Sequence, residues 1–264
     1  MTKNTAHTVL KTQALEIGYK SKSKTSSIAQ NINLSFNKGE LIGLVGANGI
    51  GKSTFIRTLT KVQPSLNGNI ILNDINLSEY NNLELAKSLS VVLTESVPSK
   101  NLSVFELVAL GRHPYTNWVG NLNKKDLETV NQALEQTNIL HLSDKKCYEL
   151  SDGQLQKVML SRALCQDTNL IILDEPTSHL DMYHKAYILK LLKTLTQETE
   201  KTILFSSHEI DLAIQLCDKI IVMTGETVEY DTPCNLISKG AFTNLFPSDL
   251  IKFDEKTGSF RVTK

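Results

Sequence analysis

The sequence predicts an α/β fold with a mostly parallel central sheet. Three short runs, 41–45, 170–173 and 202–205, are rich in isoleucine, leucine and valine, and each is too short for a typical helix. Their hydrophobicity is continuous rather than alternating, which fits strands buried on both faces, as in a parallel sheet. Helix-like segments at 51–60 and 183–198 alternate with these runs, so we expect helices on both faces of the sheet.

Ahead of the first apolar run, the pattern predicts an N-terminal antiparallel β subdomain. Residues 12–18 and 28–36 are strand-like, and the polar stretch 20–27 lies between them. Serine, lysine and threonine dominate this stretch, which indicates a hairpin turn or an exposed loop.

The middle of the chain, about 95–160, predicts a helical insertion within the α/β core. Ser103 is a candidate helix cap, and Glu106, three residues later, would complete a capping box. Gly111 and Pro114 would end this helix.

A second amphipathic segment, 124–140, would complete the insertion. About thirty residues, 236–264, then form a short C-terminal extension to which the sequence assigns no function. We expect the whole chain, 1–264, to be one domain.

Composition and the chain start argue against several classes of protein. The 264 residues carry 28 basic and 28 acidic side chains, which argues weakly against a nucleic-acid-binding surface. No apolar stretch approaches the roughly 18 residues that a transmembrane helix needs. The polar start of the chain does not resemble a signal peptide, so we expect a cytoplasmic protein. Four scattered cysteines without a C-x-x-C pair give no zinc or redox motif.

A phosphate-binding motif directly follows the first apolar run. The motif G-x-x-x-x-G-K-[ST] is complete, and we assign the nucleotide contacts to Gly46, Ala47, Asn48, Gly49, Ile50, Gly51, Lys52, Ser53 and Thr54. Its glycines allow backbone N–H groups to face phosphate oxygens, beside the positive end of the next helix. Lys52 would reach the β- and γ-phosphates, and the Ser53 hydroxyl would bind Mg²⁺. The motif predicts a P-loop NTPase but alone leaves open a GTPase, a small-molecule kinase or another NTPase.

Acidic residues and a histidine follow the other two apolar runs. Asp174 would hold Mg²⁺, and Glu175 is the candidate general base for an attacking water. His208 follows the third run and would hydrogen-bond the γ-phosphate or orient the water. Ligands bind at the carboxyl ends of parallel strands, so we expect these side chains to meet there.

The segment before Asp174 identifies a family. Residues 150–154 read Leu-Ser-Asp-Gly-Gln, which closely resembles the LSGGQ signature of ATP-binding cassette (ABC) ATPases. The order of phosphate loop, signature, acidic pair, D-loop-like segment 178–181 and His208 also resembles this family across about residues 10–235. GTPases and small kinases have no such signature.

The resemblance implies ATP and Mg²⁺ as cofactors and a head-to-tail homodimer with two ATP molecules at its interface. Ser151, Gly153 and Gln154 of one subunit would then contact the ATP of the other. Asp181 would help to couple the two sites. Tyr19 matches the aromatic residue that stacks on adenine, with a strand-surface tyrosine as the alternative.

Two residues depart from the family pattern. Asp152 replaces the second glycine of the signature, and its carboxylate should repel a γ-phosphate unless it points away. Glu95 stands where the family usually has a glutamine. A glutamate can still bind the metal but cannot donate a hydrogen bond when it is ionised, so coupling or metal preference would differ.

The predicted helical insertion indicates a subfamily of these ATPases. Residues 102–115 are similar to cassettes of importers for iron–siderophore, haem and vitamin B12. This implies integral-membrane permease subunits as partners and a substrate-binding protein as an indirect partner. The neutral charge predicts no nucleic-acid partner. The chain would lie peripherally on the cytoplasmic face of a bacterial inner membrane. The alternatives are an ABC ATPase of DNA repair or translation, and a nucleotide-binding regulator that does not hydrolyse ATP.

Overall fold

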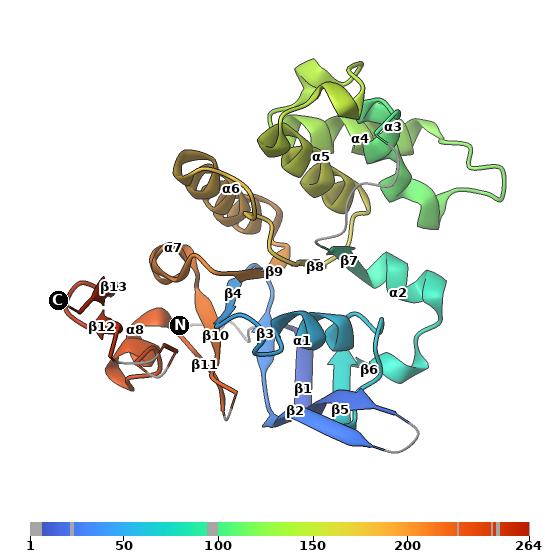
Figure 1. The fold of residues 1–264 in the computed structure, drawn as a ribbon. Helices are drawn as coiled ribbons and strands as arrows, with labels where there is room; N and C mark the ends of the chain where they lie inside the picture. Colours follow the sequence, from blue (N-terminus) through green and yellow to red (C-terminus); the bar gives the residue numbers. More distant parts are fainter. Residues whose placement is uncertain are drawn as a thin grey trace, which may run out of the picture.

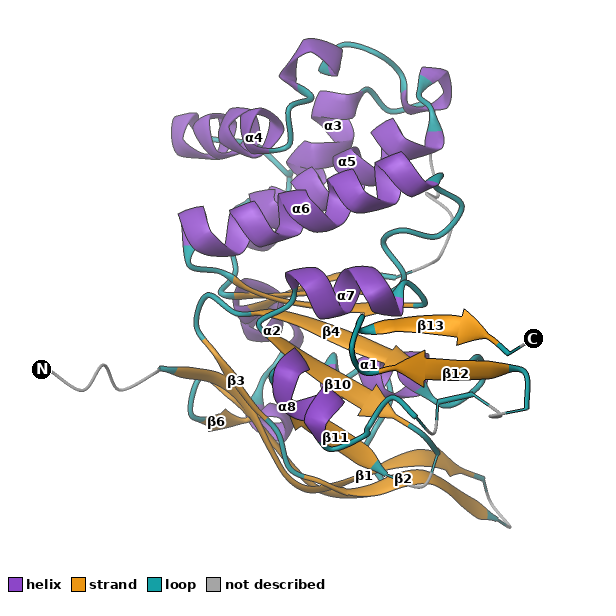
Figure 2. Ribbon diagram, turned by 90° about the vertical axis from the view of Figure 1, so that its left-hand side faces the viewer, coloured by secondary structure: helices purple, strands orange, loops and turns teal. Residues whose placement is uncertain are grey.

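The computed structural model describes residues 7–21, 24–93, 100–225, 227–243, 245–246 and 249–263. A central sheet separates a layer of helices from a second, antiparallel sheet (Figures 1 and 2). Within the described ranges, no helix combines the length and the hydropathy that a bilayer-spanning helix needs.

The central sheet has six strands and confirms the predicted fold class. In order across the sheet, the strands are Val228–Asp231 (β11), Lys219–Met223 (β10), Leu41–Gly46 (β4), Thr202–Ser207 (β9), Leu170–Leu173 (β8) and Leu89–Val92 (β7). All pairs are parallel except β10 with β11. The three predicted apolar runs become β4, β8 and β9, and every residue of these strands is buried.

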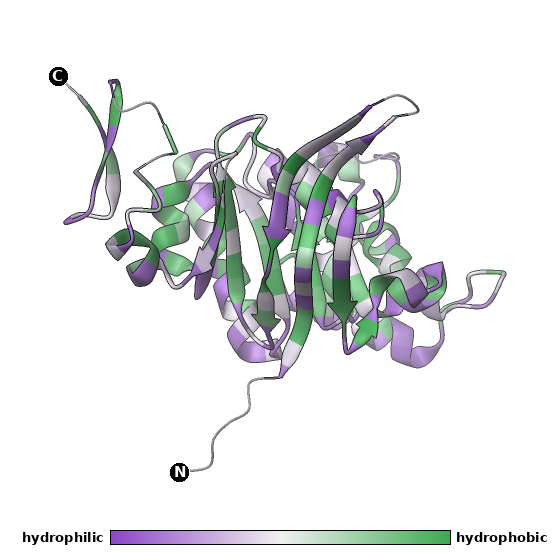
Figure 3. Ribbon diagram, turned by 90° about the horizontal axis from the view of Figure 1, so that it is seen from below, coloured by the Kyte–Doolittle hydropathy of each residue, from purple (hydrophilic) through white to green (hydrophobic). Residues whose placement is uncertain are grey.

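The second sheet is antiparallel and lies under the phosphate-loop strand. Its strands are Thr8–Lys20 (β1), Thr25–Ile32 (β2), Ser35–Asn37 (β3), Asn67–Leu72 (β5) and Ile75–Asn76 (β6). Figure 3 shows hydrophobic and hydrophilic residues mixed along these strands, and β1 carries both buried and exposed residues, as expected for a sheet with one buried face.

The single strand predicted at 28–36 is wrong, because the chain breaks there into β2 and β3. Asn31 has a left-handed backbone (φ 55°), and the Asn33 side chain bonds backbone groups of Asn31 and Ala14. Asparagine tolerates this conformation and bonds nearby backbone, which interrupts a strand. As a result, β2 and β3 pair with different parts of β1.

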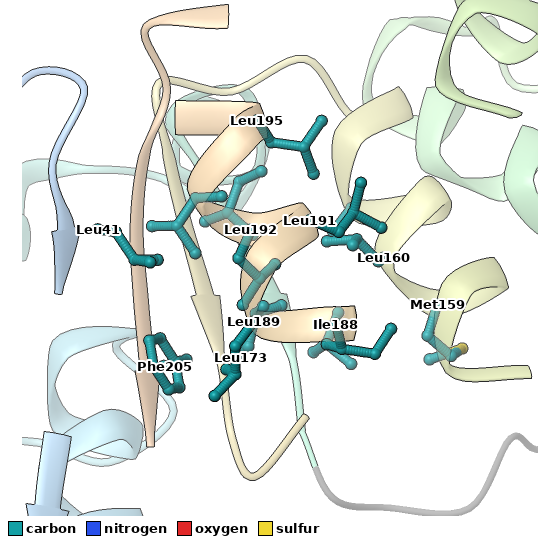
Figure 4. Close-up of a cluster of buried hydrophobic side chains, with 14 of the residues drawn as sticks. Leu41, Met159, Leu160, Leu173, Ile188, Leu189, Leu191, Leu192, Leu195 and Phe205 are labelled. Carbon is teal, nitrogen blue, oxygen red and sulfur yellow. The ribbon is translucent and has the colours of Figure 1, made fainter. Parts of the chain in front are cut away.

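Helices cover both faces of the central sheet. They are Lys52–Leu59 (α1), Asn82–Ser88 (α2), Met182–Thr199 (α6) and Ile210–Leu216 (α7), with a 3₁₀ turn at Leu77–Glu79 (η1). The buried side of α6 carries Ile188, Leu191, Leu192 and Leu195. Figure 4 shows these leucines between the sheet residues Phe205 and Leu173 on one side and Leu160 of the next helix layer on the other.

Between β7 and β8 the described chain is helical. The elements are Val104–Ala109 (α3), Leu110–Tyr115 (η2), Lys124–Gln136 (α4), Leu140–Leu142 (η3), Cys147–Glu149 (η4) and Asp152–Cys165 (α5). Ser103 and Glu106 form the predicted capping box of α3.

Two predicted helix ends need correction. The α-helix ends at Ala109, but the chain does not leave helical geometry at Gly111 or Pro114, since both lie within the 3₁₀ helix η2. Gly111 is needed there because a Cβ would lie 2.4 Å from the Arg162 carbonyl oxygen. The helix predicted at 124–140 ends at Gln136, because Asn138 adopts a left-handed backbone (φ 58°).

A buried ion pair holds the helical insertion together. Arg112 Nε lies 2.9 Å from Asp126 Oδ1, and both side chains are almost fully buried. The guanidinium also donates to the Cys165 carbonyl at the end of α5 and lies over the Tyr115 ring. Burial alone would raise the pKa of Asp126, but hydrogen bonds from Asn123 and Arg112 outweigh it, and the pKa is lowered. Arg112 therefore joins η2, α4 and α5.

The C-terminal segment forms a helix and a hairpin that the sequence did not predict. The helix is Pro233–Ser238 (α8), and the hairpin pairs Ile251–Asp254 (β12) with Ser259–Val262 (β13). Aromatic rings join the hairpin to the segment that follows α8, with Phe253 stacked against Phe242 at 5.1 Å between centroids. The hairpin lies beside α7 (Figure 2).

Replacing Arg112 by alanine should lower the free energy of unfolding by about 3–5 kcal/mol, because it leaves the Asp126 carboxylate buried without its cation. Urea denaturation measures this. The exposed pair Lys38–Glu200 supplies the control, since Lys38→Ala should cost no more than about 1 kcal/mol. Equal effects of the two substitutions would contradict the assigned role of Arg112.

Candidate active site

The phosphate loop connects a fully buried strand to a helix. β4 ends at Gly46 and α1 begins at Lys52, so the strand–loop–helix order is as predicted. Gly51 has φ 112°, and a Cβ there would lie 2.5 Å from Ile28 Cγ2, so only glycine fits. The first N–H groups of α1 have no partner within the helix and are oriented to bind an anion.

Lys52 is packed inside this loop. Its ammonium donates to the carbonyl oxygens of Gly46 (2.9 Å) and Ala47 (3.1 Å), and the residue is only 6% exposed. Burial lowers the pKa of Lys52, while the nearby carboxylates of Glu175 and Asp174 act in the opposite direction. The loop therefore places a cation between its own carbonyls and two acidic residues.

Ser206 joins the two acidic residues, and the sequence interpretation missed its role. Its hydroxyl donates to Asp174 Oδ1 at 2.7 Å and accepts from the backbone N–H of Glu175 at 2.8 Å. Ser206 is fully buried near the end of β9. The signal was available, because a serine in a buried strand must find hydrogen-bond partners.

Glu175 and His208 contact each other across two strand ends. Glu175 Oε1 lies 2.8 Å from His208 Nε2. The backbone of Glu175 is left-handed (φ 49°), which is rare for a residue with a side chain and occurs at functional sites. The structure therefore brings together the candidate base and the candidate orienting histidine, although their roles remain predictions.

Two small clefts adjoin Glu175. One, of about 230 Å³, is lined by phosphate-loop residues together with Tyr19. The other, of about 220 Å³, lies towards His208 and Ser178. The Tyr19 hydroxyl is 2.8 Å from Thr54 Oγ1, and the residue is 52% exposed, so its ring can receive a stacked base.

The signature residues lie at the start of α5 and line neither cleft. Ser151 caps the helix, and its Oγ accepts the N–H of Gln154 at 3.3 Å, which leaves the hydroxyl hydrogen as a donor. Gly153 is buried against His184, where a Cβ would lie 3.1 Å from the ring. Substrate contacts of Ser151, Gly153 and Gln154 therefore stay predictions that need a second subunit.

Asp181 lies beside this signature group. It caps α6, and its Oδ1 is 2.8 Å from both the backbone nitrogen and Nδ1 of His184. These hydrogen bonds from His184, the backbone one first, hold the pKa of Asp181 below its usual value. Through His184, Asp181 thus lies next to Gly153.

Of the two residues that depart from the family pattern, Asp152 lies within the described residues and Glu95 does not. Asp152 is exposed in the first turn of α5, where a negative charge interacts favourably with the helix N-terminus. Glu95 lies outside the described residues.

The donor set for a metal consists of hydroxyl and carboxylate oxygens. Ser53 is exposed in the first cleft, and Asp174 is 6% exposed at the end of β8. No cluster of three or more histidine, cysteine or acidic side chains fit for a metal occurs among the described residues. A hydroxyl and a carboxylate suit Mg²⁺, which completes its shell with phosphate oxygens and water.

A buried strand, a glycine-rich loop, a helix and an acidic residue that follows a strand of the same parallel sheet together define a P-loop nucleotide-binding protein. The family model described as "ABC transporter" matches residues 29–178, more than half of the chain. The chain therefore belongs to the ABC transporter family, and the predictions of an ABC ATPase and of its fold are confirmed.

Several similar proteins are ATP-binding proteins of transport systems. The chain is 31% identical to the achromobactin transport ATP-binding protein of Dickeya dadantii, over 92% of this chain and 89% of that protein. It is 32% identical to the iron(3+)-hydroxamate import ATP-binding protein of Bacillus subtilis, over 92% and 86%. A solved metal-chelate type ABC transporter in an inward-facing conformation superposes with a TM-score of 0.78, at 27% identity over 91% and 89% of the chains.

We expect Ser206→Ala to lower the rate of ATP hydrolysis about tenfold or more, because Asp174 and the Glu175 backbone lose a shared hydrogen-bond partner. Steady-state phosphate release measures this. Ser90→Ala is the control, since Ser90 is equally buried but bonds Ala163 and Thr168 away from the clefts. Equal ATPase rates of the two variants would show that Ser206 does not organise the site.

Proposed function

We propose that the chain is the ATP-hydrolysing subunit of an importer for iron–siderophore, haem or cobalamin-type cargo. The contact between Glu175 and His208, beside the phosphate loop, carries the hydrolytic part of this proposal. The importer part is supported by the relatives, whose names specify achromobactin transport and iron(3+)-hydroxamate import.

The phosphate loop binds the triphosphate. Backbone N–H groups at the start of α1 donate to phosphate oxygens, and Lys52 supplies the positive charge. The Lys52 ammonium has three donors, of which two bond loop carbonyls, so it can turn towards phosphate without leaving the loop. Tyr19 holds the adenine ring by stacking.

Ser53 and Asp174 would hold Mg²⁺. When bound, the ion neutralises charge on the β- and γ-phosphates. Ser206 keeps the Asp174 carboxylate in place through its 2.7 Å hydrogen bond, so the ligand does not have to be reoriented when nucleotide binds.

Glu175 accepts the proton of the attacking water. Its carboxylate borders both clefts, and His208 holds one of its oxygens at 2.8 Å. The left-handed backbone of Glu175 directs the carboxylate from the end of β8 towards His208. His208 is then placed to orient the base through Nε2, and it would donate to a developing charge on the γ-phosphate only when Nε2 turns from Glu175 to the nucleotide.

Two copies of the chain would complete two sites. The signature group lines neither cleft of its own subunit, which supports its use by a second subunit in a head-to-tail dimer. Ser151 presents its hydroxyl hydrogen at the N-terminus of the 14-residue α5, which favours an anion there.

The membrane partner would dock in a groove of about 320 Å³ beside α2. Its lining comes from the end of α1, from α2 and β7, and from Gln166 after α5. Gln166 Nε2 donates to the carbonyls of Ala86 and Leu89, so α5 is tied to this groove. A permease segment bound there would contact both the phosphate-loop helix and the helical insertion. The chain would then lie peripherally on the cytoplasmic side of the membrane, with a substrate-binding protein as an indirect partner.

Glu175→Gln should abolish turnover and leave ATP binding intact, because the amide keeps the shape of the side chain but cannot accept the proton. Phosphate release and equilibrium nucleotide binding measure the two effects. Retained turnover would rule out Glu175 as the base. A wild-type protein that binds ATP but releases no phosphate would favour the non-hydrolysing regulator instead.

Asp152→Asn and Asp152→Gly should strengthen ATP-dependent dimerisation several-fold, because removing a carboxylate near the γ-phosphate relieves repulsion of about 1 kcal/mol. Analytical ultracentrifugation of the variants in a Glu175→Gln background measures dimer affinity. Asp152→Glu keeps the charge and is the control. No difference between the neutral and charged variants would show that residue 152 points away from the nucleotide.

Val62→Glu should prevent assembly with the permease subunits of the importer, because it places a charge at the rim of the α2 groove. Val62 is 60% exposed, so folding and basal ATPase rate should not change. Co-purification measures assembly. Ile75→Glu is the control, since Ile75 is 47% exposed on β6 outside the groove. Equal loss of assembly in both variants would exclude this groove as the docking site.

A further inference from the structure

We propose that the ion pair between Lys185 and Glu209 is a positioning device that holds His208 against Glu175. Lys185 Nζ lies 2.5 Å from Glu209 Oε1, and both side chains are partly buried, at 25% and 29% exposure. This inference rests on the proposed hydrolytic function and assigns a role to two residues outside the phosphate loop and the acidic pair.

His208 lies in a tight turn between β9 and α7 that hydrogen bonds hold in place. The backbone N–H of Glu209 donates to Ser207 Oγ at 2.9 Å. The N–H of Ile210 donates to the His208 carbonyl at 3.1 Å, and α7 starts at Ile210. The Lys185 contact adds a side-chain anchor from another helix to this turn.

The anchor comes from the start of α6. Lys185 lies one turn after Asp181, which caps this helix, and the backbone N–H of Lys185 donates to the Asp181 carbonyl at 2.9 Å. The buried leucines of α6 fix the helix against the sheet. Lys185 therefore holds Glu209 from a rigid element, which is what a positioning residue requires.

The ion pair also separates two carboxylates that compete for one histidine. Glu175, Glu209, His208 and Lys185 all line the same cleft of about 220 Å³. Glu209 directly follows His208, so an unpaired Glu209 carboxylate could bind the imidazole in place of Glu175. By engaging Glu209, Lys185 leaves His208 Nε2 to Glu175, which it contacts at 2.8 Å.

The experiment compares Lys185→Met, Lys185→Arg and the charge-reversed pair Lys185→Glu/Glu209→Lys. We expect Lys185→Met to lower kcat about tenfold with unchanged ATP affinity, because misplacement of a catalytic group acts on the transition state. Lys185→Arg should restore kcat, and the reversed pair should restore it in part. The imidazole ¹⁵N–¹H NMR resonance of His208 should shift in Lys185→Met and return in Lys185→Arg.

The matched control is a second ion pair at the opposite edge of the same strands. Lys201 Nζ lies 2.9 Å from Asp167 Oδ1, near the starts of β9 and β8. Lys201→Met should leave both kcat and the His208 resonance unchanged. Wild-type kcat in Lys185→Met, or a lowered kcat with an unmoved His208 resonance, would overturn the proposal. The resonance reports on positioning even if wild-type protein releases no phosphate, and that result would refute the hydrolytic function instead.

Discussion

The site depends on the parallel register of β4, β9 and β8. Val45 pairs with Ser207, and Leu173 pairs with Phe205, so the three strands end at one edge. Because the register is set by buried residues on both faces, sliding one strand would cost much of the core. Ser206 lies one residue beyond the Phe205–Leu173 pair and so meets Asp174. Packing along the strands thus brings the candidate residues to one edge, and hydrogen bonds from Ser206 and His208 then hold Asp174 and Glu175 there.

The helical insertion is organised by different forces from the sheet. Its helices meet through an apolar core, but Arg112 and Asp126 fix their mutual arrangement with a charged, directional contact. A buried ion pair is sensitive to small displacements, because its hydrogen bonds must be kept to offset desolvation. The ion pair therefore fixes the helices of the insertion relative to one another, while hydrogen bonds from Ser90 and Gln166 tie α5 to β7.

Sequence reasoning predicted the parts of the fold that have strong local signals. Buried strands such as 170–173 and the complete phosphate-loop motif need no knowledge of distant residues. The short strands β5, β6 and β10 were missed, and the C-terminal hairpin gains its stability from Phe242 and α7, which the local pattern does not show. The strand break near Asn31 was missed for a related reason, since it depends on side-chain bonds across β1.

At the candidate site, the sequence indicated which residues end each strand but not how they are held. The Ser206 bridge and the Lys185–Glu209 pair join residues more than twenty positions apart, so they appear only when the chain is folded. The signature residues could be identified by resemblance alone, and their contacts with nucleotide require a second chain.

At Glu175, the left-handed backbone makes thermal stability and the proposed catalytic role favour different residues. A side-chain-bearing residue in this conformation costs about 1 kcal/mol relative to glycine. Glycine at this position would therefore relieve strain and raise the melting temperature, while removing the proposed base. Selection of the chain for heat resistance alone would then favour variants that lack the proposed base at residue 175. Glutamate at this position is therefore a residue that the backbone conformation alone does not favour.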